Sequence, residues 1–200
     1  MKIYRDIVQG SPEWFAKRKG KMTGSEGQAI GNNGKGLDTL IVKLMAEFYS
    51  VGEKPFFENE DTRRGKELEE YARDMYELEN GCQVEQVGFI ERDEYVGVSP
   101  DGLVGDEGMI EIKSVNDVNH FSLILNGEKD IESKYIWQMQ MNLLVSERKW
   151  IDYVSYNPNF EKSLLVFRIT PDEKKQAKLL EGFEKGIALI NQIKKQYESK

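Results

Sequence analysis

Residues 99–113 read SPDGLVGDEGMIEIK, and this stretch combines a strand pattern with polar residues at fixed intervals. Side chains alternate between the two faces of a strand, so Glu111 and Lys113 share one face, roughly 7 Å apart, while Ile110 and Ile112 point into a core. Asp101 follows a predicted strand, and a hairpin-like return through residues 105–108 would bring it alongside Glu111. The stretch therefore predicts a sheet that presents two carboxylates and a lysine together.

Two carboxylates held in this way form a hard-oxygen site suited to Mg²⁺, which keeps several waters and also binds substrate phosphate. Such a metal polarises a phosphoryl oxygen and generates hydroxide, while Lys113 can orient or deprotonate the attacking water. The alternative is a surface hairpin in which Glu111 and Lys113 form an ion pair of little energetic value. The spacing alone leaves both interpretations open.

The rest of the chain predicts helices around several short strands. Period-two segments predict strands at 84–91, 95–99, 109–114, 150–156 and 163–170, with the first three forming an antiparallel meander. Helical spacing predicts helices at 14–21, 40–49, 64–79 and 135–145, and a last helix after residue 171. The predicted fold class is α/β with an α+β-like order: a central mixed β-sheet flanked by helices, in a single domain over residues 1–200.

Two of these helices carry more specific predictions. The apolar face of helix 64–79 is predicted to consist of Leu68, Ala72, Met75 and Leu78. Thr170-Pro171-Asp172-Glu173 has the form of a capping box with proline at the first helical position. The last helix then carries five apolar residues on one face: Leu180, Phe183, Ile187, Ile190 and Ile193.

The segment 31–36, which reads GNNGKG, predicts a flexible loop after a helix that begins at Thr23 or Ser25. It lacks the spacing of a phosphate-binding P-loop, because Ala29 stands where the first glycine is needed and no Ser or Thr follows Lys35. Flexibility is therefore the preferred interpretation over nucleotide binding.

The composition restricts the kind of site that the chain can build. Cys82 and His120 are the single cysteine and the single histidine among 200 residues, which excludes an internal disulfide, a four-cysteine cluster and a histidine-rich zinc site. Any metal must then be held by oxygen ligands. No apolar run reaches the roughly 20 residues that span a bilayer, and no secretion signal is visible, so we expect no membrane partner and a cytoplasmic location.

The net charge of −7 argues against a simple DNA-binding module, because Lys and Arg supply most of such affinity. It does not argue against a nuclease, since a bound cation offsets a carboxylate site and local basic clusters can guide phosphates. Two such clusters are present: Lys17, Arg18, Lys19 and Lys21, then Arg63, Arg64 and Lys66. From charge alone, a solvated surface is the preferred interpretation of each cluster.

Five ordered motifs resemble the lambda exonuclease family of viral and prophage recombination nucleases, a branch of the PD-(D/E)xK superfamily. They run from Trp14 to about Tyr156, and they are Trp14-Phe15-x-x-Arg18 with Thr23-Gly24-Ser25-Glu26, Arg64-Gly65-x-x-x-Glu69, Ser99-Pro100-Asp101-Gly102, Glu111-Ile112-Lys113, and Tyr135-x-x-Gln138-x-Gln140. Glu69 alone could be a solvated carboxylate paired with Arg73, and Gln138 alone would carry no information. The order and spacing of all five give the resemblance its specificity.

The resemblance implies a restriction-endonuclease-like core with a metal centre. Asp101, Glu111 and the backbone carbonyl of Ile112 would hold Mg²⁺, for which Mn²⁺ substitutes, and Glu69 would serve a second metal or its water shell. Lys113 would activate the nucleophile, and Gln138 would support that lysine or the scissile phosphate.

The resemblance also implies residues that bind the DNA substrate. Arg18 and Ser25 match the positions that grip the terminal 5′-phosphate, and Ser99 would add a hydrogen bond near them. Lys35 stands where the family can place an arginine on its glycine-rich loop, although lysine lacks the bidentate fork of arginine. Tyr135, one turn before Gln138, is predicted to contact the substrate.

The activity implied is 5′-to-3′ digestion of linear double-stranded DNA to mononucleotides, which leaves 3′ single strands for phage-type recombination. The implied assembly is a homotrimeric ring around the duplex, with Lys17, Lys19 and Lys21 facing the channel, and the implied partner is a single-strand annealing protein in the host cytoplasm. A structure-specific or restriction-type endonuclease on the same core is the alternative, because the catalytic motif is shared across the superfamily. A catalytically dead binding or scaffold protein is a third hypothesis, which the retained lysine and carboxylates disfavour.

Overall fold

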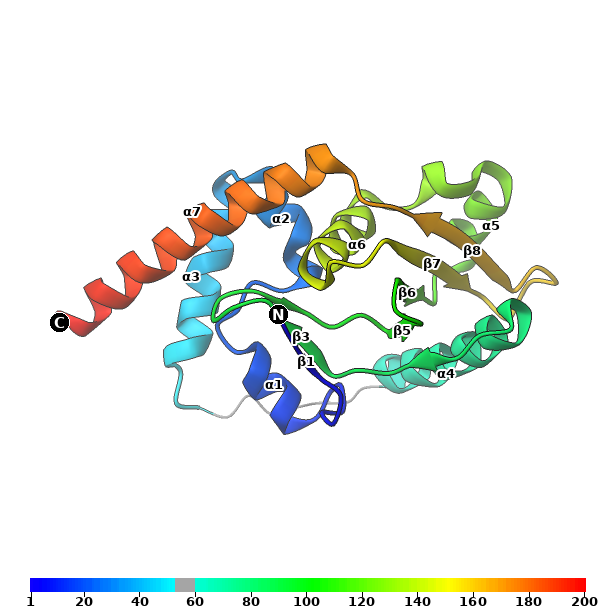
Figure 1. Ribbon diagram of the computed structural model, residues 1–200, viewed down its shortest axis with the longest axis horizontal. Coiled ribbons are helices and arrows are strands. Elements are labelled where there is room, and N and C mark those ends of the chain that lie inside the picture. Colours follow the sequence, from blue (N-terminus) through cyan, green and yellow to red (C-terminus); the bar gives the residue numbers. More distant parts are fainter. Residues whose placement is uncertain (53–59) are drawn as a thin grey trace.

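The computed structural model describes residues 1–52 and 60–200, without the side chains of residues 60–64 and 66. A five-stranded mixed sheet in the order β2-β5-β6-β7-β8 lies beside a three-stranded antiparallel sheet in the order β1-β3-β4 (Figure 1). The strands of the larger sheet are β2 Val84–Glu85, β5 Gly102–Val104, β6 Gly108–Lys113, β7 Trp150–Tyr156 and β8 Leu164–Ile169. Those of the smaller sheet are β1 Lys2–Tyr4, β3 Phe89–Glu91 and β4 Gly97–Val98.

The larger sheet is mixed because β6 and β7 run parallel, with Glu111 paired to Tyr153, whereas its other neighbouring strands are antiparallel. A parallel pair needs a long crossover connection. Here the crossover consists of α5 Asp117–Asn126, the 3-10 turn η2 Gly127–Asp130 and α6 Ser133–Ser146. This connection brings α6 against the face of β6 that carries Glu111.

Helices cover both faces of the larger sheet, so the predicted mixed sheet flanked by helices is confirmed (Figure 1). Helix α4, Glu60–Asn80, packs on one face, where a buried cluster comprises Ala72, Tyr76, Ile110, Ile112, Val154 and Tyr156. The other face is covered by α6 and, beyond it, by α2 Gly27–Asn32, α3 Lys35–Tyr49 and α7 Glu173–Glu198. Near the N-terminus, α1 Pro12–Arg18 and the 3-10 turn η1 Gly24–Glu26 precede these helices.

Helix α7 packs tightly on the N-terminal helices because glycines stand at the contact. A side chain at Gly182 would meet the carbonyl oxygen of Ile30, and one at Gly186 would lie 2.6 Å from the sulfur of Met22. The remaining buried residues of α7 are Leu179, Phe183 and Ile190. The prediction that Leu180 belongs to this face was therefore wrong, since Leu180 is exposed and Leu179 packs in its place.

The predicted antiparallel meander of three strands was also wrong. The segment 84–91 divides at residues 86–88 into β2 and β3, which belong to different sheets. Only glycine fits at position 88, because the backbone of Ile7 passes so close that a Cβ would collide with it. The chain then returns to the larger sheet through β5, a strand that the turn-like sequence Asp101-Gly102 concealed. Asp101 consequently stands at the crossing from one sheet to the other.

Several helix ends differ from their predictions. The break around residues 31–36 is confined to Asn33, which is left-handed at φ 50°, and Gly34, because α3 already begins at Lys35 and buries Leu37. Helix α7 is capped by Asp172, whose side chain accepts from the Lys175 N–H, rather than by Thr170.

Two further differences concern which helical residues are buried. Helix α5 was not predicted, since its ten residues mix Asn, Ser and His with the apolar residues. On α4, Leu78 is 84% exposed, and Tyr76 is the buried residue of that turn. None of the helices in the described ranges combines the length and the apolar character that crossing a bilayer requires.

Candidate active site

Strand β6 places its side chains as the alternation predicts. Glu111 is fully buried on the face that α6 covers, whereas Ile110 and Ile112 pack in the cluster under α4. Lys113 follows Glu111 on the same face, and its Nζ donates a hydrogen bond to Glu111 Oε1 at 2.6 Å. The alternative of an exposed surface pair does not apply, because the Glu111 side chain is 1% exposed and that of Lys113 is 23% exposed.

Asp101 stands beside this strand because β5 and β6 pair antiparallel, with Gly102 opposite Ile110. The next pair along the ladder brings Asp101 to Glu111. Oδ2 of Asp101 accepts a hydrogen bond from the backbone N–H of Ile112 at 2.7 Å. This contact holds the aspartate against the strand that carries the glutamate and the lysine.

Three donors converge on the carboxylate of Glu111. Besides Lys113, the amide Nε2 of Gln138 donates to Oε1 at 2.5 Å, and the amide Nδ2 of Asn142 donates to Oε2 at 3.0 Å. Gln138 and Asn142 lie one turn apart on α6, so one face of that helix supplies both amides. Glu111 is thus fixed in orientation on both of its oxygens.

Glu69 approaches the same centre from α4. Its Oε1 accepts from Arg73 Nη2 at 2.7 Å, as the i,i+4 spacing suggests, but the arginine is itself largely buried. Burial raises the pKa of Glu69 to about 7, with a further contribution from the negative charge of Asp101.

The charges of the centre act on one another. Burial, reinforced by Asp101, raises the pKa of Glu111 to about 7. Burial by itself would lower the pKa of Lys113, but the neighbouring Glu111 and Asp101 outweigh it and raise that pKa. Lys113 is therefore held as a cation beside Glu111 and Asp101.

The oxygen atoms at this centre suit a hard divalent cation that takes only a few of its ligands from the protein. The described residues contain no group of three or more His, Cys, Asp or Glu side chains arranged to hold a metal by themselves. Mg²⁺ does not require such a group, because one or two carboxylates, waters and a substrate phosphate commonly complete its shell. Asp101, Glu111 and the Ile112 carbonyl would hold the metal, and Glu69 would serve its water shell.

A second polar cluster surrounds Arg18 at the end of α1. Its Nη1 donates to Ser99 Oγ at 3.3 Å and its Nη2 donates to Thr23 Oγ1 at 2.9 Å, while the guanidinium stacks 4.2 Å from the ring centre of Trp14. Trp14 Nε1 also donates to Ser99 Oγ at 2.9 Å. Burial lowers the pKa of Arg18. The guanidinium is partly desolvated, which strengthens its attraction for an anion.

Ser25 and Ser99 join this cluster as the motifs predict. Ser25 Oγ lies 3.4 Å from Thr23 Oγ1, and Ser99 accepts from Arg18 two residues before Asp101. Thr23 and Glu26 form a capping box that orders η1. The structure therefore brings Arg18, Ser25 and Ser99 together, and the chain connects them directly to Asp101.

Tyr135 and Lys35 occupy different surroundings. The ring centre of Tyr135 lies 5.4 Å from Lys113 Nζ, so this ring lies beside the candidate centre. Lys35 is the exposed first residue of α3, so the glycine-rich loop on which it was expected does not extend to it. Arg63, Arg64 and Lys66 lie outside the described side chains.

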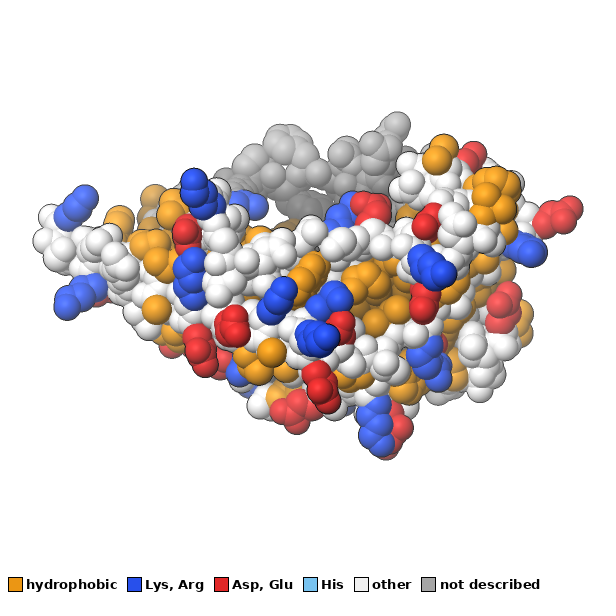
Figure 2. Space-filling view, turned by 90° about the horizontal axis from the view of Figure 1, so that it is seen from above, with side chains coloured by type: hydrophobic (Ala, Val, Ile, Leu, Met, Phe, Trp, Pro, Cys, Tyr) orange, Lys and Arg blue, Asp and Glu red, His pale blue; other side chains and the backbone are white. Residues whose placement is uncertain are grey.

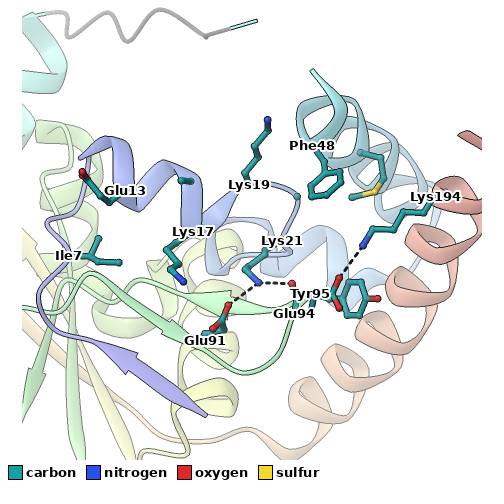
Figure 3. Close-up of a pocket in the computed structure, with 13 residues that line it drawn as sticks. Ile7, Glu13, Lys17, Lys19, Lys21, Phe48, Glu91, Glu94, Tyr95 and Lys194 are labelled. Carbon is teal, nitrogen blue, oxygen red and sulfur yellow. Dashed lines mark hydrogen bonds and ion pairs between the residues drawn. The ribbon is translucent and has the colours of Figure 1, made fainter. Parts of the chain in front are cut away.

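The remaining residues of the first basic cluster line a pocket of about 580 Å³ between α1, α3 and α7 (Figure 3), and they are Lys17, Lys19 and Lys21. Lys21 forms an ion pair with Glu91 at 3.0 Å, and Lys17 donates to the Tyr4 hydroxyl at 3.0 Å. Lys19 donates to the carbonyl of Ser50. On the face shown in Figure 2, acidic and basic side chains are interspersed. Part of the positive charge of this cluster is therefore balanced within the protein.

One residue of the centre was missed by sequence reasoning. Asn142 lies one turn after Gln138, so helical spacing from a motif residue is the signal that could have found it. The pairing of Glu69 with Arg73 was foreseen, but as a solvated pair, whereas Arg73 is buried.

A mixed sheet that presents Asp101, Glu111 and Lys113 at one point, with a helix supplying Gln138 behind them, defines a nuclease of the PD-(D/E)xK superfamily. Comparison with known proteins gives the family. A family model described as a YqaJ-like viral recombinase domain matches residues 13–149. The chain therefore belongs to the YqaJ-like viral recombinase family, and the resemblance that the motifs predicted is confirmed.

Solved structures agree with this assignment. The alkaline exonuclease LHK-Exo from Laribacter hongkongensis is 30% identical with a TM-score of 0.80, over 94% of this chain and 99% of that one, and its complex with dAMP gives the same values. A phage-related exonuclease from Haemophilus somnus 129PT shares the fold, at 18% identity and a TM-score of 0.64, over 88% of this chain and 96% of that one. Among curated proteins, no sequence matches the chain.

Proposed function

We propose that this nuclease digests linear double-stranded DNA from a 5′-phosphorylated end, in the 5′-to-3′ direction and with Mg²⁺, and that it releases mononucleotides and leaves a 3′ single strand. One observation carries the proposal: Arg18 contacts Ser99, and Ser99 is separated from Asp101 by a single residue. A terminal phosphate bound at Arg18, Ser25 and Ser99 would lie next to the catalytic carboxylates. An exonuclease that removes one nucleotide at a time needs its terminal-phosphate site close to its catalytic carboxylates.

Each residue of the catalytic centre has a distinct role in the proposed hydrolysis. A bound Mg²⁺, with Mn²⁺ as its substitute, would polarise the scissile phosphate and lower the pKa of a water. Asp101, Glu111 and the Ile112 carbonyl would hold the cation, and Glu69 would serve its water shell. Lys113 stays protonated at Nζ, so it orients the attacking water and offsets the charge that builds on the phosphate. Gln138 keeps Glu111 and Lys113 in place, and Tyr135 packs beside the lysine.

The chemistry of the product supports repeated cleavage from one end. Water adds to phosphorus and the bond from phosphorus to O3′ of the terminal nucleotide breaks, with the proton passing to that oxygen. The strand that remains then carries a new 5′-phosphate, which is the group that Arg18 binds. The related LHK-Exo has been crystallised with dAMP, a nucleoside monophosphate.

The proposed assembly is a homotrimeric ring that encloses the duplex and works with a single-strand annealing protein. The net charge of −7 and the internally paired lysines leave few free cations for phosphates, so a monomer would release DNA readily at physiological salt. A closed ring retains the duplex by topology rather than by affinity, and cyclic symmetry is an ordinary outcome of heterologous interfaces.

The decisive test uses three substrates: an end-labelled linear duplex with a 5′-phosphate, the same duplex with a 5′-hydroxyl, and a closed circle. Each is incubated with Mg²⁺ and with chelator. The expected result is metal-dependent release of labelled mononucleotide, fastest from the phosphorylated end. Efficient cutting of the closed circle would instead establish the endonuclease, and no release with any metal would contradict both.

A further inference from the structure

Asn142 is a partner of Glu111 that none of the sequence motifs includes. It lies on α6, is 1% exposed, and donates from Nδ2 to Oε2 of Glu111 at 3.0 Å. Gln138 holds the other carboxylate oxygen from the preceding turn. Without Asn142, Glu111 would keep donors on Oε1 alone and could rotate about its own side chain.

The carbonyl of the same amide shows that Glu111 determines the orientation of Asn142. Oδ1 of Asn142 is buried and has no hydrogen-bond partner among the described residues. A buried unpaired carbonyl is unfavourable, so a free amide would turn to relieve it. Turning this amide would press Oδ1 against the Glu111 carboxylate, which offers only acceptors. The bond to Glu111 therefore fixes the amide despite its unpaired oxygen.

Gly24 provides the space that this arrangement requires. A Cβ at Gly24 would lie 2.7 Å from Asn142 Oδ1, closer than ordinary contact allows. The glycine is needed here for close approach and not for a left-handed backbone, because its φ is not positive. Gly24 stands between Thr23 and Ser25, so the segment that contacts Arg18 rests directly against Asn142.

We infer that Asn142 is a positioning residue that holds Glu111 in its metal-binding orientation, and that Gly24 is required so that Asn142 can occupy this position. The inference rests on the proposed function, since it takes Glu111 as a metal ligand. Residues that hydrogen-bond a metal ligand typically contribute 10–100-fold in metal affinity or activity. The glycine of the motif Thr23-Gly24-Ser25 thereby gains a role in the catalytic centre.

Titration of the metal-free protein with MnCl₂ by calorimetry tests the role of Asn142 without relying on activity. Asn142→Ala should raise the dissociation constant for Mn²⁺ about 10–100-fold. Gln140→Ala is the matched control, because Gln140 is also a buried amide on α6 but bonds to the backbone of Thr170 and Asp172. The control should lower the melting temperature and leave the dissociation constant unchanged. A folded Asn142→Ala protein with wild-type Mn²⁺ affinity would overturn the inference.

The role of Gly24 is tested by a double-mutant cycle of Gly24→Ala and Asn142→Ala. Gly24→Ala alone should weaken Mn²⁺ binding by displacing Asn142, and it should add little to Asn142→Ala, since the methyl group enters the space that the amide leaves. Additive losses in both Mn²⁺ affinity and urea stability would show that the two residues act separately. If the wild type binds neither Mn²⁺ nor Mg²⁺, the proposed function fails, while the cycle of unfolding free energies in chelator still decides whether Gly24 accommodates Asn142.

Discussion

Arg18 and Ser99 are 81 residues apart in sequence, yet Nη1 of the arginine lies 3.3 Å from Oγ of the serine. This bond joins the end of α1 to the segment that leads into Asp101. The proposed phosphate pocket and the proposed metal centre are joined by this segment but are formed by different side chains. Each site can therefore be removed separately by substitution, and its effect can be compared with that of the other.

Replacement of Lys113 by Met should abolish cleavage and preserve the fold. The long apolar side chain fills similar space but cannot orient water or offset charge, and loss of such a group typically costs 10²–10⁴-fold in rate. Release of labelled nucleotide from a linear duplex is the measurement, with circular dichroism as a check of folding. Lys134→Met is the control, since Lys134 also lies over the Tyr135 ring but is exposed and paired with Glu132. Normal Mg²⁺-dependent activity in Lys113→Met would remove the lysine from the mechanism.

Arg18→Ala should erase most of the preference for a 5′-phosphate. A charge-assisted hydrogen bond contributes about 1.5–3 kcal/mol, which corresponds to roughly tenfold or more in the phosphate-dependent rate. The measured quantity is the ratio of digestion rates for phosphorylated and hydroxyl ends. Lys19→Ala removes a neighbouring cation that does not contact Ser25 or Ser99, and it should leave the ratio of rates unchanged. An unchanged ratio in Arg18→Ala would place the phosphate site elsewhere.

The metal-free protein should lose stability as the pH rises through neutrality. The pKa values of Glu111 and Glu69 are raised to about 7 from an ordinary value of 4.5. Groups with a raised folded-state pKa stabilise the fold in their protonated form, so their contribution is complete below pH 4.5 and is lost as the pH rises through 7. Melting temperatures in chelator should fall over that interval, by roughly 2–4 °C for each kcal/mol, and Mg²⁺ should restore them.

Asp101→Asn should reduce this loss of stability with pH. The asparagine oxygen can still accept from the Ile112 N–H, while the negative charge that acts on Glu111 and Glu69 is gone. The variant should therefore melt higher than the wild type in chelator at pH 8, and the two should converge near pH 5, although the variant no longer cleaves DNA. Equal dependence on pH in both proteins would show that Asp101 does not repel the glutamates.

The proposed ring predicts a mass near three times 23.1 kDa in solution. Light scattering coupled to size exclusion gives that mass directly, and digestion of long duplexes should then remain processive as salt increases. A protein that stays monomeric at micromolar concentration would contradict the ring and would require another means of retaining DNA.

The sequence predicted the catalytic strand well because its information is local. Alternation along residues 109–113 determines which side chains share a face, and Glu111, Ile112 and Lys113 lie as that pattern requires. Period and turn residues likewise predict most of the helices and strands in order, with α5 and β5 among the exceptions. These features depend on residues that are close in sequence, so they can be predicted from a single sequence.

Other features depend on contacts between distant segments. The division of residues 84–91 between two sheets follows from the approach of Gly88 to Ile7, which no pattern within the segment reveals. Asn142 reaches Glu111 because the crossover lays α6 on β6, and Gly24 meets Asn142 because η1 packs on α6. Periodicity predicts that such helices exist but not which helix covers which face.

The placement of α7 has a consequence for the synthesis of the protein. This helix is the last of the described elements, yet its glycines pack against Ile30 and Met22, which flank the segment that carries Thr23, Gly24 and Ser25. A ribosome releases residues in order, so the N-terminal helices emerge about 150 residues before the helix that completes their packing. The segment that forms the proposed phosphate pocket therefore reaches its final packing only after α7 has been synthesised.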